Sequence, residues 1–596
     1  MEISNLFELF EFQLQQYSGE ILLHNKGDEI GTQASIPECI AKRDLISQFL
    51  LSEGYQKGDK IGILSYRGSI EWFLADMAIQ QLDMIPVPIH SNYTLDEMNY
   101  VFKDAAIQFC FVSSVSLVSK FQQLAVSPEY LILKETDHEK SITKIFEVAL
   151  KDTTRMQINE ARSAISNDDV CTIIYTSGST GNPKGVMLTH NNILSNIKST
   201  TALLPIKHGD VAISFLPMSH IFERMVCYAY FYLGVHVYFL SNNQKVVATI
   251  KKIRPHYFTV VPKVLENIYD LILDSETKNL VKFKLIEWAY KVGEQYGKDI
   301  PKSFLYNFQL WFVKRFIFRP WRKAMGGRIK VIMVGAAALE PKIGRLFSAA
   351  GMQVREGYGM TETSPVIAFN RWEKGGFKFG TVGKAVPDVE IKIEESEDEL
   401  LGQRSIGEIL VKGPNVMAGY YNQEELSKSV FDNGWFKTGD MGRFTEDGFL
   451  VIEDRKKNYF KTSGGRYVAP QPIEQKLLQS AYIKQAMIIG FKRPAVAALI
   501  IPDVVKLKTW CAINDIHWTS ITYMIHHLKV LEFYNKILNE LNSTSKKHEK
   551  VLLIRLIEEE WTIENEMLTP TLKLKRLKIK EKYKKQIDDM YESKLH

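Results

Sequence analysis

The chain has 596 residues, a net charge of +6 and five cysteines, and these values exclude several classes of protein. Its length exceeds what one hydrophobic core usually covers, so we expect at least two domains. The small net charge, with Lys and Glu interspersed, argues against nucleic acid as a partner. The cysteines are far apart and form no C-x-x-C pair, which argues against disulfides and a zinc site. A reducing, cytoplasmic location fits best.

Neither the N-terminus nor the longest apolar segment predicts export or a membrane span. The sequence MEISNLFELFEF lacks the basic region and the small-residue cleavage site of a signal peptide. The apolar run from Met225 to Leu240 contains His236. It is also shorter than the roughly 20 residues that cross a bilayer. We expect this run to form a buried helix and strand.

Short apolar runs alternate with helical patterns through the first 380 residues or so. The predicted strands include KIGIL, QFCFV, VAISFL, VHVYFL, HYFTVV and IKVIMVG, and the segment SIEWFLADMAIQQL has helical spacing. This alternation predicts α/β layers. From about Gly380 the segments VEIKI, GEILVKG and GFLVIEDR, separated by turn residues, predict a smaller β unit. The basic segment that follows, Lys456 to Gly465, is the predicted boundary and hinge.

The apolar run VCTII leads into the loop YTSGSTGNPKG, Tyr175 to Gly185, which holds three glycines and one lysine. A glycine-rich turn after a strand exposes backbone N–H groups that can converge on an anion. Phosphate is therefore the predicted ligand, with a flexible surface turn as the alternative. The pattern of kinase and GTPase loops fails, because no hydroxyl residue follows Lys184.

This loop and three later segments resemble the signature motifs of the acyl-adenylate-forming (AMP-binding) enzyme superfamily. The later segments are GYGMTETSP, WFKTGD and DRKKNYFKTSGGRYVAPQPIE. FLPMSHIFER, VPKVLENIY and LTPTLKLKR are similar to segments of long-chain fatty-acid–CoA ligases. The resemblance implies an α/β fold: a large N-terminal part of two α/β subdomains plus a distorted β-barrel, residues 1–456, and a small mobile C-terminal α+β domain, residues 457–596.

The resemblance also implies a reaction. ATP activates a long-chain fatty acid to acyl-AMP, and coenzyme A then accepts the acyl group, so that the products are acyl-CoA, AMP and pyrophosphate. ATP, Mg²⁺ and coenzyme A are the implied cofactor and co-substrates. A carboxylate is already ionised at pH 7, so the first step needs charge stabilisation and no general base. Two alternatives stay open: transfer to an acyl carrier protein, and an inactive lipid-binding scaffold, although a scaffold is expected to have lost residues such as Lys184 or Glu362.

The family's functional residues fall on specific positions of this sequence. The implied catalytic residues are Thr361 at the α-phosphate, Glu362 as the Mg²⁺ ligand, His220 near the acyl carboxylate, and Lys573. The implied phosphate loop comprises Thr176, Ser177, Gly178, Ser179, Thr180, Gly181 and Lys184. The other implied binding residues are Gly335 and Ala336 beside the acyl pocket, Gly357 and Tyr358 at adenine, Asp440 and Arg455 at the ribose hydroxyls, Lys457 at the hinge, and Lys461 in the segment that approaches the thioester site.

Lys573 is the implied adenylation lysine because it follows shortly after the proline of LTPTLKLKR. Lys575 lies two residues away and would point to the same side of an extended segment, so the choice between the two lysines stays open. The resemblance implies that the C-terminal domain rotates about Lys457 between the two half-reactions. The preferred chain length and the oligomeric state are not predicted.

The segment from Leu310 to Gly327 interleaves aromatic and basic residues. The aromatic residues are Trp311, Phe312, Phe316, Phe318 and Trp321, and the basic ones are Lys314, Arg315, Arg319, Arg322 and Lys323. Such a composition suits the boundary between anionic head groups and acyl chains, which predicts peripheral contact with the inner face of a membrane. Inward packing of the aromatic rings is the alternative. Pro320 limits any continuous amphipathic helix here.

Overall fold

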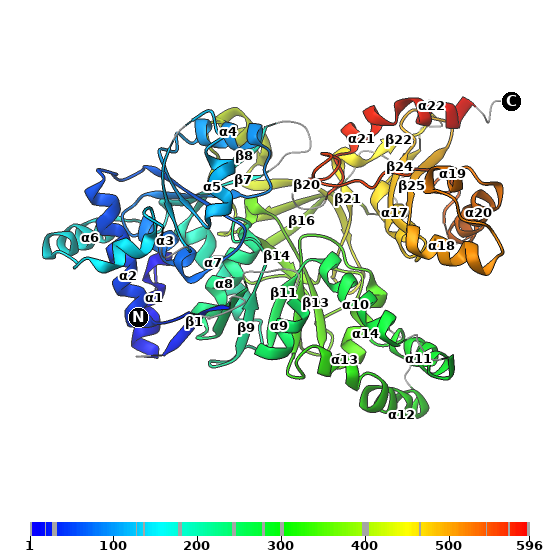
Figure 1. The fold of residues 1–596 in the computed structure, drawn as a ribbon, viewed down its shortest axis with the longest axis horizontal. Helices are drawn as coiled ribbons and strands as arrows, with labels where there is room; N and C mark the ends of the chain where they lie inside the picture. Colours follow the sequence, from blue (N-terminus) through cyan, green and yellow to red (C-terminus); the bar gives the residue numbers. More distant parts are fainter. Residues whose placement is uncertain are drawn as a thin grey trace. The chain divides into compact units, whose positions relative to one another are not determined.

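A computed structural model gives the fold (Figure 1). It describes residues 3–17, 20–26, 32–126, 128–134, 138–176, 182–240, 246–276, 280–298, 303–395, 405–463, 466–543, 545–569 and 573–592. The contacts of the chain define two compact units. The first unit comprises Met1–Ile391, Val411–Phe436 and Thr445–Leu450, and the second comprises Lys392–Leu410, Lys437–Phe444 and Val451–His596. The boundary at residue 457 stays a prediction.

The first unit contains a four-stranded parallel sheet in the order β4-β3-β5-β6. Its strands are β3 (Lys60–Ser65), β4 (Ile85–His90), β5 (Phe109–Val112) and β6 (Glu129–Ile132). The helices of this region are α2 (Ile36–Ser52), α3 (Ile70–Gln80), α4 (Leu95–Asp104), α5 (Val115–Phe121) and α6 (Asp152–Ala164). β5 is buried throughout, and β3 and β4 are buried from their second residue on, because helices and neighbouring strands cover both faces of a parallel sheet. The edge strand β6 is partly exposed. The predicted strands KIGIL and QFCFV and the predicted helix at residues 69–82 are confirmed.

A nine-stranded sheet of the first unit has the order β15-β14-β13-β12-β11-β9-β10-β1-β2. It is parallel from β13 to β1 and antiparallel at both ends. The strands are β1 (Ile21–Lys26), β2 (Gln33–Ser35), β9 (Val211–Ser214), β10 (His236–Leu240), β11 (Tyr257–Val260), β12 (Val331–Val334), β13 (Gln353–Gly359), β14 (Val366–Phe369) and β15 (Lys384–Ala385). Four of the predicted apolar runs supply β9 to β12. The alternating α/β pattern is thereby confirmed.

The remaining helices of the first unit lie before, between and after these strands (Figure 1). They are α1 (Leu9–Gln16), α7 (His190–Thr201), α8 (Ile221–Tyr232), α9 (Val246–Ile253), α10 (Pro262–Glu276), α11 (Leu280–Gly293), α12 (Phe304–Phe312), α13 (Arg319–Ala324), α14 (Pro341–Ala349) and α16 (Glu424–Val430). The run from Met225 to Leu240 forms the buried part of α8 and the strand β10, as predicted. Across the described ranges, no helix combines the length and the apolar character that a bilayer span requires. All five cysteines are buried and free.

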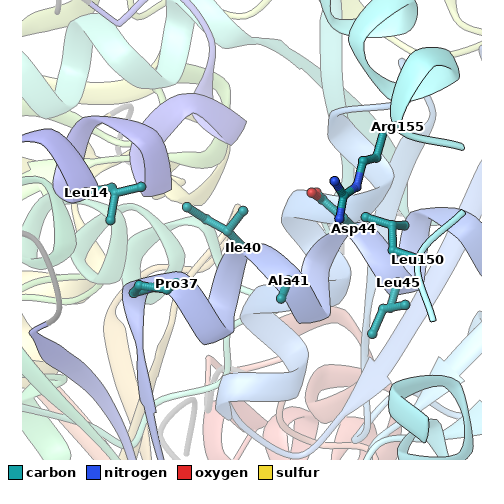
Figure 2. Close-up of a pocket in the computed structure, with 8 residues that line it drawn as sticks. All are labelled: Leu14, Pro37, Ile40, Ala41, Asp44, Leu45, Leu150 and Arg155. Carbon is teal, nitrogen blue, oxygen red and sulfur yellow. The ribbon is translucent and has the colours of Figure 1, made fainter. Parts of the chain in front are cut away.

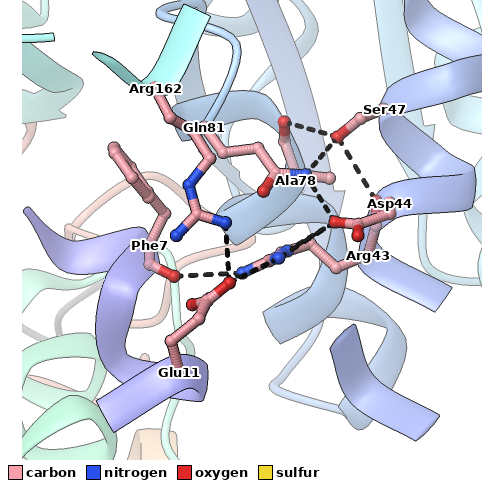
Figure 3. Close-up of polar contacts among 8 residues, drawn as sticks. All are labelled: Phe7, Glu11, Arg43, Asp44, Ser47, Ala78, Gln81 and Arg162. Carbon is pink, nitrogen blue, oxygen red and sulfur yellow. Dashed lines mark hydrogen bonds and ion pairs between the residues drawn. The ribbon is translucent and has the colours of Figure 1, made fainter. Parts of the chain in front are cut away.

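A buried guanidinium holds α1 against α2 (Figure 3). Arg43 Nη2 lies 2.8 Å from Glu11 Oε1, and Arg43 Nη1 donates a hydrogen bond of 3.1 Å to the carbonyl of Phe7. Arg162 of α6 reaches the same Glu11 oxygen at 2.7 Å. Burial by itself would raise the pKa of Glu11, but the two guanidinium groups outweigh it and lower the pKa to about 2. Glu11 is therefore ionised at neutral pH and ties the three helices together.

The β-rich segments predicted after Gly380 form a five-stranded sheet in the order β16-β17-β20-β19, with β21 beside β20. Its strands are β16 (Glu390–Glu395), β17 (Gly407–Lys412), β19 (Phe431–Asp432), β20 (Trp435–Phe444) and β21 (Leu450–Arg455). A small antiparallel pair joins β22 (Phe460–Lys461), inside the segment predicted as the hinge, to β23 (Tyr467–Val468), directly after it. The prediction of a β unit in this part of the chain is confirmed.

The C-terminal part of the second unit is an α+β layer structure. Its sheet has the order β24-β25-β26, formed by Ile483–Ile489, Val496–Pro502 and Val551–Leu556. Alternate residues of β25 enter different cores, because side chains of a strand point to opposite faces: Ala498 and Ile500 join one cluster, Leu499 and Ile501 the other. The first core includes residues of α17 (Pro470–Leu478), α18 (Val504–Ile513), α19 (Ile521–Met524) and α20 (Leu528–Ser543), and the second includes residues of α21 (Arg576–Lys582) and α22 (Lys584–Glu592).

Candidate active site

The two ends of the predicted phosphate loop are held by an antiparallel strand pair. β7 (Val170–Thr176) pairs with β8 (Lys184–Thr189), and the register places Thr176 opposite Lys184. A Cβ added to Gly185 would lie 2.9 Å from Ile173 Cγ2, so a larger residue here would force the Ile173 side chain to move. The other predicted loop residues, Ser177, Gly178, Ser179, Thr180 and Gly181, lie outside the described residues.

A tyrosine that sequence reasoning missed connects this loop to the predicted Mg²⁺ ligand. Tyr420 lies on β18 (Gly419–Tyr420), which pairs with β8. The ammonium nitrogen of Lys184 is 5.4 Å from the centroid of the Tyr420 ring, and the Tyr420 hydroxyl donates a hydrogen bond of 3.0 Å to Glu362 Oε1. The structure therefore brings Lys184 and Glu362 to opposite parts of one side chain. The sequence offered only the pair of tyrosines at 420 and 421 as a signal.

A rigid turn positions Thr361 and Glu362 after β13. A Cβ added to Gly359 would lie 1.8 Å from the carbonyl oxygen of Pro365, so only glycine allows this approach. The Thr363 hydroxyl donates to the same carbonyl at 2.6 Å, and Met417 N donates to the carbonyl of Glu362 at 2.9 Å. Glu362 is buried and Thr361 half-buried. The predicted adenine-contacting residues, Gly357 and Tyr358, lie on β13 directly before this turn and are also half-buried.

His220 lies at the N-terminal end of α8 and faces a second histidine that the sequence did not reveal. The ring centroids of His220 and His90 are 4.8 Å apart, in an edge-to-face arrangement. Burial, together with the nearby His220 and Lys120, lowers the pKa of His90 to about 3. His90 is therefore neutral at pH 7 and can exchange a hydrogen bond or an edge contact with His220 without charge repulsion.

The predicted acyl-pocket loop packs against the same helix. Gly335 directly follows β12, and a Cβ added to it would lie 2.7 Å from Phe222 Cζ. Ala336 next to it has a left-handed backbone, with φ of +68°. The structure thus brings Gly335 next to Phe222, near the end of α8 that carries His220, while the role of Gly335 and Ala336 at an acyl pocket stays a prediction.

A buried network fixes α8 to the strand that leads into the phosphate loop. Arg224 pairs with Asp76 of α3 and donates a hydrogen bond of 2.8 Å from Nη1 to the Thr172 hydroxyl on β7. Arg224 Nε also donates to the Tyr228 hydroxyl at 2.8 Å. Arg224 and Asp76 are fully buried, and a buried charge pair is costly to break because one charge is then left without its partner. Interactions in the protein interior therefore fix the position of α8, which begins directly after His220, relative to β7.

Within the second unit, Asp440 and Arg455 lie in contact. Asp440 Oδ1 is 2.7 Å from Arg455 Nε, and the carboxylate is buried while the guanidinium is half-buried. The following residues are held in place as well: Asp454 accepts hydrogen bonds from Asn458 Nδ2 at 2.8 Å and from Gln471 N at 2.7 Å. Burial raises the pKa of Asp454. Asp454, which sequence reasoning missed, therefore anchors the helical turn that contains Lys457.

The three predicted lysines of the second unit are all exposed. Lys461 Nζ lies 4.5 Å from the ring centroid of Tyr467 in the neighbouring strand. Lys573 N donates a hydrogen bond of 3.0 Å to Thr569 Oγ1, whereas Lys575 is half-buried and is the N-cap residue of α21. The next residue, Arg576, pairs with Glu474 through two hydrogen bonds of 2.7 and 2.6 Å. This geometry leaves the Lys573 side chain the more accessible of the two.

Two further findings limit the site. A groove lined by side chains of α1, α2 and α6 and by Leu150, with Asp44 and Arg155 close together, contains none of the predicted site residues (Figure 2). Among the described residues, no group of three or more His, Cys, Asp or Glu side chains is placed to hold a metal ion. Glu362 is therefore not part of such a group.

The chain resembles known proteins along nearly its whole length. Residues 10–421 match the family described as AMP-binding enzyme, and residues 459–595 match the AMP-binding enzyme C-terminal domain. Mouse long-chain-fatty-acid–CoA ligase 6 is 31% identical over 93% of this chain and 82% of that protein. Long-chain-fatty-acid–CoA ligase FadD15 of Mycobacterium bovis is 28% identical over 95% of this chain and 93% of that protein.

The fold has relatives among solved structures too. O-succinylbenzoate coenzyme A synthetase (MenE) from Bacillus subtilis, in complex with ATP and magnesium ion, superposes with a TM-score of 0.68 at 20% identity, over 96% of this chain and 99% of that one. At this identity the likeness shows a shared fold.

Proposed function

This chain belongs to the family of AMP-binding enzymes, and from that premise we propose that it is an AMP-forming acyl-CoA ligase for long-chain fatty acids. The observation that carries the proposal is the arrangement of Lys184, Tyr420 and Glu362. It places a cation beside a phosphate-binding loop and a hydrogen-bonded carboxylate on the other side of the same tyrosine. A site that transfers a nucleotide needs both charges, because it must neutralise phosphates and hold a divalent cation.

The Glu362 carboxylate fits the demands of Mg²⁺. This ion is usually bound by one or two carboxylates together with substrate phosphates and water, and not by a cage of protein ligands. Glu362 is buried, and the Tyr420 hydroxyl fixes one of its two oxygens at 3.0 Å. When bound, Mg²⁺ supplies positive charge that offsets the charge of the phosphates. The protein's own part is to orient Glu362 toward the phosphate loop.

The remaining residues either bind and orient the substrates or stabilise negative charge during the reaction. Lys184 and Lys573 offset negative charge on the phosphates, Thr361 donates a hydrogen bond to the α-phosphate, and His220 orients the acyl carboxylate. The carboxylate attacks the α-phosphorus, the bond to pyrophosphate breaks, and acyl-AMP forms. The thiol of coenzyme A then attacks the acyl carbon, loses its proton, and releases AMP.

The second unit supplies the nucleotide's ribose contacts and the moving parts. Asp440 and Arg455 bind the ribose hydroxyls, a role supported by their contact at 2.7 Å. Lys457 is the hinge, and Lys461 belongs to the segment that approaches the thioester site. The hinge role is supported by the short helical turn Lys456–Asn458, which Asp454 anchors from one side. We place the protein in the cytoplasm, with peripheral membrane contact.

A substrate panel tests the proposed function. The purified chain is incubated with ATP, Mg²⁺, coenzyme A and saturated fatty acids of increasing length, and AMP release is measured. We expect release that depends on both coenzyme A and a long-chain acid, and much slower release from Lys184→Ala prepared in the same way. Replacing coenzyme A by an acyl carrier protein decides between the two acceptors. Absence of fatty-acid-dependent AMP release with either acceptor contradicts the proposal.

A further inference from the structure

The helix α12 is apolar along most of its length but buries none of its residues. Phe304, Phe308 and Trp311 are 88%, 55% and 56% exposed, and their spacing places them on one stripe of the helix. Leu305, Phe312 and Phe316 extend the exposed surface. We call these six residues the aromatic patch. Its rings contact one another: Phe308 stacks on Trp311 at 6.0 Å, and Trp311 meets Phe316 edge-on at 6.1 Å between centroids.

The aromatic patch is attached firmly to the first unit. On the other side of α12, Tyr306 and Leu310 pack against the core cluster. Phe318 and Trp321, which follow the π-helical turn Val313–Ile317, are fully buried in that cluster. The interleaved aromatic residues of the sequence therefore divide: Phe318 and Trp321 pack inward, whereas Trp311, Phe312 and Phe316 do not. Figure 1 shows α12 beside α11 and α13 at the edge of the first unit.

Cations border the aromatic patch. Lys314, Arg315, Arg319 and Lys323 are exposed, and no ion pair joins them to a carboxylate within the described ranges. From Ser303 to Leu339 the sequence contains no Asp or Glu. Arg322 differs, because it is half-buried and donates to the carbonyls of Lys314 and Ala350 at 3.0 and 2.7 Å. Its role is structural, and the four exposed cations form the charged border.

We propose that the aromatic patch and its charged border dock the protein on an anionic lipid bilayer. Aromatic side chains insert at the level of the head groups, and Lys and Arg beside them pair with anionic lipids. A fully polar partner would leave the rings in water, and a neutral apolar one would leave the cations unmatched. The same core cluster contains Val334 of β12, directly before Gly335, so the surface is connected through packed side chains to the predicted acyl-pocket loop.

Co-sedimentation with vesicles tests this docking surface without reference to catalysis. The full chain is mixed with vesicles of phosphatidylcholine alone or in equal mixture with phosphatidylglycerol. We expect binding to the anionic vesicles only, and weaker binding as salt is added. Each cation near the surface changes affinity by about fivefold, so the triple variant Lys314→Gln, Arg315→Gln, Arg319→Gln should bind roughly 100-fold more weakly.

Matched variants separate local from general effects. Lys103→Gln, Lys144→Gln and Lys151→Gln remove the same charge from exposed positions elsewhere in the first unit and should leave vesicle binding within about twofold of wild type. Phe308→Ser with Trp311→Ser should reduce binding as well, since both rings are exposed and their loss leaves the core intact. Circular dichroism and ATP–pyrophosphate exchange verify that each variant is folded.

Three outcomes would overturn the proposal. The first outcome is that the wild-type chain does not bind anionic vesicles. The second is that substituting the border cations and substituting the control cations weaken vesicle binding equally. The third outcome is that sedimentation velocity shows a wild-type dimer, that the double variant Phe308→Ser, Trp311→Ser is a monomer, and that neither wild type nor double variant binds vesicles. The patch is then an interface between copies of the chain.

Discussion

Replacing Tyr420 by Phe tests the central link of the proposed site. The variant keeps the ring that lies 5.4 Å from Lys184 Nζ and removes the hydroxyl that donates to Glu362 Oε1 at 3.0 Å. A hydrogen bond to a charged group contributes about 1.5–3 kcal/mol, which corresponds to roughly 10- to 100-fold in rate when it holds a group needed in the transition state. We therefore expect slower adenylation with the fold intact.

The assay is ATP–pyrophosphate exchange over a series of Mg²⁺ concentrations. The exchange rate of Tyr420→Phe should fall by about 10- to 100-fold, and half-saturation should require more Mg²⁺ because Glu362 is no longer held in place. Tyr421→Phe is the matched control, since it removes a hydroxyl from the adjacent tyrosine, and it should behave as wild type. Wild-type exchange and Mg²⁺ dependence in Tyr420→Phe would refute the assigned role of Glu362 and of its tyrosine.

Three further predictions concern other residues. Lys184→Ala should slow exchange by about 10²–10³-fold, because one transition-state contact is lost, and an unchanged rate contradicts the assignment. Lys573→Ala should abolish acyl-AMP formation but leave coenzyme A attack on supplied acyl-AMP nearly intact; if only Lys575→Ala does this, the adenylation lysine is Lys575. Burial, with nearby Arg224, lowers the pKa of His190 to about 3, so the unfolded chain takes up the proton first as pH falls below 6.5. Wild type should lose about 2 kcal/mol of stability from this group between pH 7 and pH 5, and urea midpoints of His190→Gln at these two pH values should differ by correspondingly less.

The sequence by itself determined the elements and the order of the motifs. Apolar runs such as residues 60–64 and 211–214 form strands because strand formation depends on the composition and periodicity of a few neighbouring residues, which the sequence shows directly. The glycine at 359 is also local: the turn after β13 brings Pro365 too close for any Cβ. The motifs then identified the family by sequence resemblance alone, with no knowledge of how their residues are arranged in space.

Only the tertiary structure decided which side chains meet. Tyr420 contacts Glu362 across 58 positions of sequence, and His90 faces His220 across 130, because strand pairing and sheet order bring together segments that local periodicity cannot relate. The aromatic segment gives the same lesson. Phe318 and Trp321 are buried whereas Trp311 and Phe316 are exposed, since the π-helical turn and Pro320 redirect the chain and change the face that each residue presents to the core.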